Sequence, residues 1–247
     1  MRKSAARDGD GFRLRGLQVT RLETFVDAAF AFSLTLLVIV FDDLPGSVAE
    51  LRAALRQLPA FAFCFVMLAM FWAGHNRWSR RFGLEDARST LLSLAFVFVV
   101  MVYVYPLRMV ASGAMAFFTG GWAPHAFTID PAHALVDLQT LFIVYAAGFG
   151  LLSWLLRQLN AHALRHADSL GLDSLERFET RSEIGVHGIL AASAVLSLIL
   201  SVLLLVGVPP DSSFDWMVSL PVWVYVLVGP AIAIYLHRRQ GHRPQAD

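Results

Sequence analysis

The chain has 247 residues, of which 57% are hydrophobic and 16% charged, and its mean hydropathy is +0.58. Soluble domains are about 45–50% apolar and about 25% charged, so this composition excludes a disordered, collagen-like or nucleic-acid-binding chain and disfavours an ordinary soluble domain. The formal net charge of +1 carries little information, because a protein that crosses a membrane several times uses the placement of its charges rather than their sum.

Six apolar segments are long enough to cross a bilayer. A helix that spans about 30 Å at about 1.5 Å per residue needs about 20 mostly apolar residues. The segments are 21–41, 58–74, 90–111, 134–156, 184–208 and 216–236. The sequence therefore predicts an all-α membrane protein with an N-terminal segment over 1–20, a six-helix transmembrane domain over 21–236 and a tail over 237–247.

The basic residues separate between alternate loops. Of the 20 Lys and Arg residues, 17 lie in the segment up to Arg21, the second loop, the fourth loop and the tail, while Arg52, Arg56 and Arg108 lie elsewhere. Loops rich in Lys and Arg face the cytoplasm. This pattern predicts six spans with both termini in the cytoplasm.

Ionisable side chains at membrane depth are costly and are functional candidates by default. Asp27 lies about one and a half helical turns inside Arg21, at the depth where the second helix ends with Trp72 and His75. A buried carboxylate needs hydrogen-bond donors, so we expect a network of Arg21, Asp27, Trp72 and His75. The alternative is that these side chains sit separately in the interface, where Arg and Trp are common.

The same residues carry a family resemblance. The segment RLETFVDAAFAFSLTLL resembles the signature of the transmembrane-protein-175 family of potassium channels, which has Arg, three residues and Phe-Ser-Asp, then an apolar stretch with Thr-Leu-Leu. The matching positions are Arg21, Phe25, Val26, Asp27 and Thr35-Leu36-Leu37. The segment FWAGH, with Trp72 and His75, is similar to that family's second-helix motif. At the level of motifs the resemblance covers about residues 21–110.

The resemblance implies a passive, potassium-permeable cation channel without a cofactor. It implies a six-helix bundle that forms a homotetramer in the prokaryotic inner membrane, with the first helix lining a central pore. Carried over by position, the constriction falls on Phe32, a hydroxyl on Thr35, and further pore-facing positions on Leu36 and Ile39. Arg21, Phe25 and Asp27 would hold the helix in place.

Periodicity and composition leave several alternatives open. Phe32, Thr35, Leu36 and Ile39 have the i, i+3, i+4, i+7 spacing of one helical face, which fits a packing face as well as a pore lining. Val26 and Phe32 depart from the family's Ser and its Ile or Leu, and Ser93 stands nearest to an expected asparagine.

Other functions need other residues. A proton-conducting or proton-coupled transporter would use Asp27, His75 and His187. An intramembrane enzyme would need an acid–base pair such as His75 and Asp27, but the sequence has no catalytic constellation that supports it, and we expect no enzyme activity. His162 and His166 have the spacing of a helical metal pair, yet no third ligand is evident and we expect no metal site.

Overall fold

The computed structural model describes residues 7–39, 46–130, 133–208 and 216–244. Within these ranges the regular structure is helical, apart from an isolated bridge between Arg7 and Arg13. The longer helices are α1 (Arg21–Ile39), α2 (Val48–Leu55), α3 (Leu58–Phe82), α4 (Ala87–Phe118), α5 (Ala134–Arg165) and α6 (Ser174–Gly207). The C-terminal part comprises η2 (Trp216–Ser219), α7 (Leu220–Trp223), η3 (Val224–Leu227) and α8 (Val228–Gln240).

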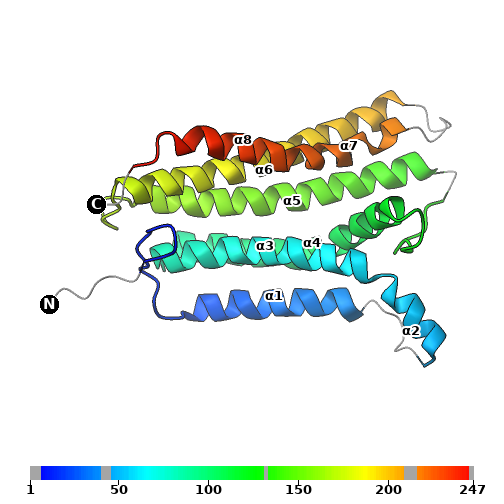
Figure 1. Ribbon diagram of the computed structural model, residues 1–247, viewed down its shortest axis with the longest axis horizontal. Helices are drawn as coiled ribbons and strands as arrows, with labels where there is room; N and C mark the ends of the chain where they lie inside the picture. The colour runs from blue at the N-terminus through cyan, green and yellow to red at the C-terminus, as the bar shows by residue number, and fades with distance from the viewer. Residues whose placement is uncertain (1–6, 40–45, 131–132, 209–215, 245–247) are drawn as a thin grey trace.

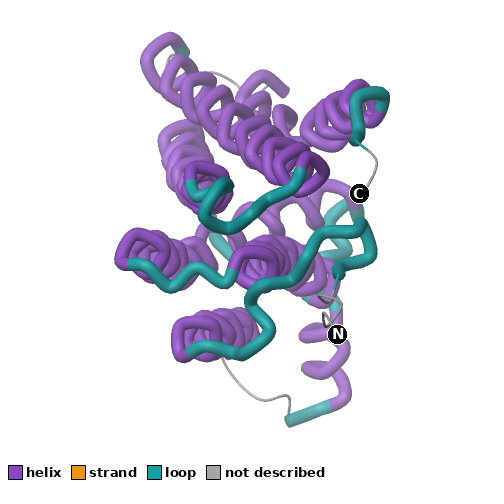
Figure 2. Tube along the Cα trace, turned by 90° about the vertical axis from the view of Figure 1, so that its left-hand side faces the viewer, coloured by secondary structure: helices purple, strands orange, loops and turns teal. Residues whose placement is uncertain are grey.

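The long helices lie side by side along the length of the molecule (Figure 1). Helix α1 forms one edge and packs on α3 and α4, α4 packs on α5, and α5 on α6; α7 and α8 form the opposite edge against α6. Turned by 90°, the bundle shows its long helices nearly end-on, with the loops that connect them towards the viewer (Figure 2). Both described chain ends lie at the same end of the bundle, which we call the terminal end.

The helices begin and end at residues suited to those positions. Asp86 caps α4 by accepting from the amide of Ser89, and Asp173 and Glu176 form a reciprocal capping box at the start of α6. Gly83 ends α3 in the left-handed region, with φ 58°, which costs glycine nothing because it has no Cβ.

The all-α class that the sequence predicts is confirmed, with five helices in the described part of the chain long and apolar enough to cross a membrane. They are α3, α4, α5, α6 and the C-terminal run from Met217 to Gln240. Helix α1 is not among these five, and positions 40–41 of the predicted first span lie outside the described residues. Helices α3, α4, α5 and α6 begin or end beyond the predicted spans. For α3, α5 and α6 the extension is a set of polar turns at the terminal end of the bundle.

The last predicted span is not one regular helix. Residues 216–240 pass through two 3₁₀ turns before α8 begins. Pro221 and Pro230 lie in this segment, and proline removes a backbone donor and clashes with the preceding turn. The two prolines therefore divide the last predicted span into short helical pieces.

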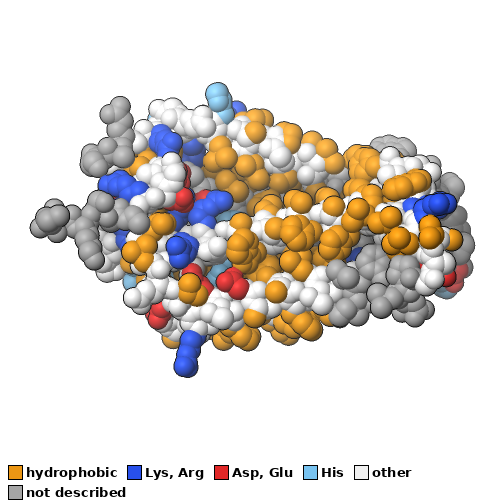
Figure 3. Space-filling view, turned by 60° about the horizontal axis from the view of Figure 1, so that its bottom comes forward, with side chains coloured by type: hydrophobic (Ala, Val, Ile, Leu, Met, Phe, Trp, Pro, Cys, Tyr) orange, Lys and Arg blue, Asp and Glu red, His pale blue; other side chains and the backbone are white. Residues whose placement is uncertain are grey.

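Charged side chains gather towards the two ends of the molecule, with apolar side chains between them (Figure 3). The core beneath is aromatic: Phe71 packs edge-on against Tyr103 and Phe149, with ring centroids 6.3 and 5.6 Å apart. Gly148 lets α5 approach α4, since a Cβ there would lie 2.6 Å from the Tyr103 ring. This arrangement is that of a membrane helix bundle whose polar ends face water.

Candidate functional site

Helix α1 has one face buried against its own chain. Val26, Phe30, Ser33 and Leu37 are at most 4% exposed, and their spacing places them along one side of a helix. Phe30 packs on Phe96 of α4, with ring centroids 5.8 Å apart. Val26, which stands where the family has Ser, is therefore a packing residue in this chain.

The opposite face of α1 is uncovered in the single chain. Phe25 and Phe32 are 52% and 50% exposed, and Thr35 is also exposed. Ala28 is exposed and completes a stripe at positions 25, 28, 32 and 35, whose spacing places them on one helical face. Sequence reasoning missed Phe25 and Ala28 as members of this stripe because the family motif assigns Phe25 a holding role.

Two of the predicted pore-facing residues stand differently. Leu36 is half-buried and packs against the core, so it lies between the two faces of α1. Ile39 is the last residue of α1, and its side chain lies outside the described residues. The stripe that starts at Phe25 thus ends, as far as it is described, at Thr35.

Thr35 presents an oxygen on this stripe. Its hydroxyl donates to the carbonyl of Ala31, one turn earlier, at 2.9 Å. Because the hydroxyl proton is used in this bond, the oxygen still has its lone pairs. These can accept a hydrogen bond or contact a cation.

The predicted polar network separates into two contacts, and Arg21 takes part in neither of them. The Nε1 of Trp72 donates to Oδ1 of Asp27 at 2.7 Å, joining α3 to α1. His75 is 2% exposed and its Nε2 lies 2.9 Å from the hydroxyl of Ser93 on α4. Arg21 is exposed, and within the described residues no hydrogen bond or ion pair joins it to Asp27.

His75 is held as a core residue. Its ring stacks on Phe96 at a centroid distance of 5.5 Å and an interplanar angle of 16°. Ser93, singled out in the sequence as the nearest polar substitute for an asparagine, supplies its hydrogen-bond partner. This contact joins α3 to α4, the two helices on which α1 packs.

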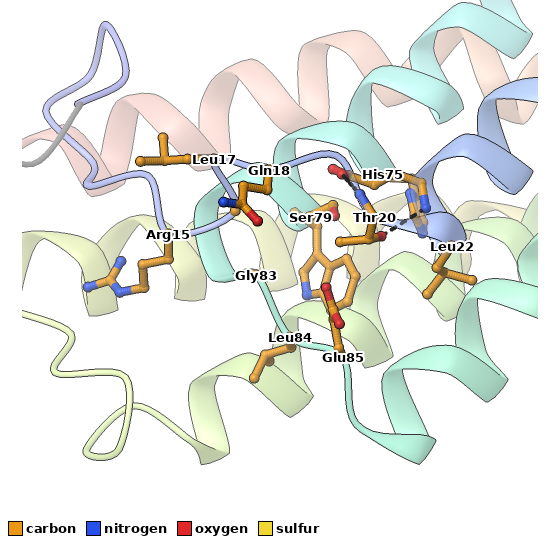
Figure 4. A pocket seen from close by; sticks show the side chains of 13 residues that line it. Arg15, Leu17, Gln18, Thr20, Leu22, His75, Ser79, Gly83, Leu84 and Glu85 are labelled. Atoms are coloured by element: carbon orange, nitrogen blue, oxygen red, sulfur yellow. Dashed lines mark hydrogen bonds between the residues drawn. The ribbon is translucent and has the colours of Figure 1, made fainter.

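A capping box that sequence reasoning missed starts α1. The amide of Glu23 donates to Thr20 Oγ1 and the amide of Thr20 donates to Glu23 Oε2, each at 3.1 Å. Both residues line a cavity of about 350 Å³, together with His75 and Trp78 (Figure 4). The Thr-x-x-Glu spacing is the signal that could have revealed it.

Two further buried histidines, His162 and His187, lie near carboxylates. Nε2 of His162 lies 2.7 Å from Asp86, and Nε2 of His187 lies 3.9 Å from Glu183. His166 contacts His162 ring to ring at 4.5 Å. No cluster of three or more candidate metal ligands occurs among the residues that the structure describes.

The bundle of apolar helices, with polar ends and an uncovered stripe on its first helix, defines the class of protein as an integral membrane protein. A family model described as the endosomal/lysosomal potassium channel TMEM175 matches residues 21–106. A protein named potassium channel from Marivirga tractuosa is 31% identical over 201 residues, which cover 78% of each chain.

A solved structure also resembles the fold. It is the crystal structure of a variant of the potassium channel MtTMEM175 in complex with a nanobody–MBP fusion protein, with a TM-score of 0.75 and 26% identity, covering 96% of this chain and 100% of that one. The chain belongs to the TMEM175 family of potassium channels, as its motifs indicate. This is a family of ion channels and not of enzymes.

Proposed function

We propose that the protein is a passive, potassium-permeable channel in which the α1 helices of four copies surround a central pore. Phe32 would form the constriction and Thr35 a hydroxyl ring beside it. Membership of the family concerns the chain as a whole, whereas these two roles are assigned to its individual residues. The proposal is supported by one observation above all, the uncovered stripe of α1 at positions 25, 28, 32 and 35.

The composition of this stripe favours a pore or a subunit contact over a lipid-facing surface. Between positions 195 and 207 the exposed residues of α6 are apolar, as are Val195, Leu196 and Ile199. The exposed side of α1 also contains Thr24, Asp27 and Thr35. Polar groups at membrane depth typically face other protein segments or a water-filled cavity. The exposed side of α1 would therefore face another copy of the chain or a pore.

Phe32 gives the proposed pore a hydrophobic gate. A narrow apolar ring excludes water and conducts only when its helices move apart. Phenyl rings also present negative faces to cations. Four such rings would therefore close the pore more tightly than aliphatic side chains, while the Thr35 oxygens would offer polar contact next to the constriction.

Helix α1 would supply the sixth membrane span. Its 19 residues correspond to about 28 Å at about 1.5 Å per residue, close to the thickness of the hydrocarbon core. The positive loops would then place the terminal end in the cytoplasm. The bacterial relative supports a prokaryotic inner membrane as the location.

The test is potassium flux from liposomes that contain the purified protein, with sodium and proton controls at two pH values. We expect potassium to leave along its gradient without a proton gradient. Phe32→Ala should raise the flux and disturb selectivity while the oligomer persists. Phe98→Ala is the matched control, because Phe98 is 69% exposed but lies on α4.

Three outcomes would contradict parts of the proposal. Unchanged flux in an assembled Phe32→Ala channel would remove Phe32 from the constriction. Flux that requires a proton gradient and disappears in Asp27→Asn would favour the proton-coupled alternative. A mass measurement in detergent that gives a monomer would exclude a pore between copies.

A further inference from the structure

The segment that leads into α1 is fastened to the terminal end of the bundle. We call residues 7–16 the N-terminal strap. Phe12 is fully buried in it, with its ring 5.5 Å from that of Phe82 and 4.7 Å from the guanidinium of Arg81. Arg81 in turn forms ion pairs with Asp8 and Asp10. The strap is therefore packed as part of the fold, and its position is set by specific contacts.

A single buried carboxylate, Glu176 of α6, holds the centre of the strap. Its side chain is 0% exposed and accepts from both Arg13 and Arg15. Arg13 contributes its amide at 2.9 Å, Nε at 3.0 Å and Nη2 at 2.7 Å, and Arg15 contributes Nη2 at 2.8 Å. Charge-assisted bonds of this kind are the strongest hydrogen bonds in proteins, and a buried charge that loses its partner is costly.

The strap is also pinned to the end of α3. The amides of Arg15 and Gly16 both donate to the carbonyl of Arg80, at 3.1 and 3.0 Å. Gly16 is required there, because a Cβ would lie 2.5 Å from the carbonyl oxygen of Ser79. Only positions 17–20 separate this point from the first residue of α1. The start of α1 is therefore tied to both α3 and α6.

We propose that Glu176 is a positioning residue for the pore helix. Through Arg13 and Arg15 it keeps the start of α1 against α3 and α4, and so holds Phe32 away from the pore axis. This inference rests on the proposed function. Once the strap is released, the hydrophobic effect favours burial of the four Phe32 rings against one another, and a closed apolar ring does not conduct.

The test variant is Glu176→Gln. Gln retains the capping-box geometry at the start of α6 but removes the charge that binds two arginines. The control is Asp168→Asn, which removes a 96% exposed carboxylate paired with Arg177 near the same end of the bundle, without touching the strap. Trypsin reports on the strap directly, since release should speed cleavage after Arg13 and Arg15, identified by mass spectrometry.

Potassium flux is then compared in two backgrounds, with Phe32 and with Phe32→Ala. We expect Glu176→Gln to lower flux in the Phe32 channel by at least roughly tenfold, because loss of even one of its charge-assisted hydrogen bonds shifts an equilibrium by about that factor. In the Phe32→Ala channel it should have little effect, because the ring that closes is gone. A defect of folding or assembly would lower flux in both backgrounds.

Each outcome decides a different point. Faster cleavage of the strap with unchanged or higher flux in the Phe32 channel would overturn the positioning role, as would equal losses in both backgrounds. A strap as resistant to trypsin in Glu176→Gln as in the unmodified protein would show that Glu176 does not hold it. Absence of flux from every variant, including Phe32→Ala, would instead contradict the proposed channel function.

Discussion

Trp72 and Asp27 are joined by a hydrogen bond of 2.7 Å between the indole Nε1 and a carboxylate oxygen, which links the exposed side of α1 to α3. Neither residue is buried in the single chain, and Trp72 is 37% exposed. A charge-assisted bond at such a place gains strength if a neighbouring copy covers it, because removal of water lowers the local dielectric.

Trp72→Phe should separate a packing role from this hydrogen bond, since it keeps an aromatic ring and loses the donor. We expect the free energy of unfolding to fall by about 1 kcal/mol, less than the roughly 1.5–3 kcal/mol usual for a bond to a charged acceptor, because the pair is partly exposed. Thermal unfolding in detergent measures the effect. Trp72→Phe and Asp27→Asn should be non-additive when combined, and additive losses would show that the two side chains act independently.

Ser93→Ala tests the second contact behind α1. It leaves Nε2 of His75 without its partner in a site where His75 is 2% and Ser93 0% exposed. An unsatisfied buried polar group costs about 1–3 kcal/mol, so the free energy of unfolding should fall by that amount.

Ser89→Ala is the matched control on the same helix. Ser89 is also 0% exposed, but its hydroxyl has no hydrogen-bond partner among the described residues, so its removal should be neutral or stabilising. Equal losses in the two variants would mean that the contact between His75 and Ser93 contributes nothing specific.

The sequence predicts most of the helices because their apolar stretches are long and the basic loops alternate. It also predicts that Asp27 and Trp72 lie at the same depth, since one helix leaves the terminal end and the next returns to it. What it could not predict is which side of α1 each residue faces. Leu36 shares the helical spacing of Phe32 yet is half-buried against the core, because the neighbours of a helix decide which edge of a stripe is covered.

The position of the strap could not be predicted from the sequence, for a related reason. In the sequence, Arg13 and Arg15 count only among the positive charges of the segment up to Arg21, and nothing marks Glu176 as their partner. Their contact joins residues 163 and 161 positions apart, and hydropathy and spacing carry no information about pairing over such separations. His75 and Ser93 were both noted, but their pairing depends on the rotation of two helices about their axes.

Asp86 gives the terminal end of the bundle a dependence on acid pH. Burial raises the pKa of its carboxyl, but hydrogen bonds from His162 and from the amide of Ser89 outweigh that effect and lower the pKa to about 2, from an ordinary 3.8. A folded-state pKa below the unfolded value stabilises the protein above about pH 4, and this contribution is lost as the pH falls towards about 2.

Asp86→Asn checks this, because asparagine retains the N-cap of α4 and removes the titrating group. The unmodified protein should be more stable than the variant at pH 5, and the difference should shrink between about pH 4 and pH 2. Denaturant unfolding in detergent at a series of pH values measures it. A difference that stays constant over this range would show that Asp86 contributes no charge-dependent stability.

Gly148 provides the last test, of how closely α5 packs on α4. A Cβ at this position would lie 2.6 Å from Cδ2 of Tyr103, whose ring is 1% exposed and enclosed by Tyr145 and Phe71. In an open helix Gly→Ala gains about 1 kcal/mol, but overpacking a filled core costs about 1–3 kcal/mol. Gly148→Ala should therefore lower the thermal midpoint, whereas Gly229→Ala, which meets no atom within 4 Å on α8, should leave it unchanged or raise it slightly. Equal midpoints for the two variants would mean that the Tyr103 ring moves aside freely, so that the glycine is not what sets the distance between these helices.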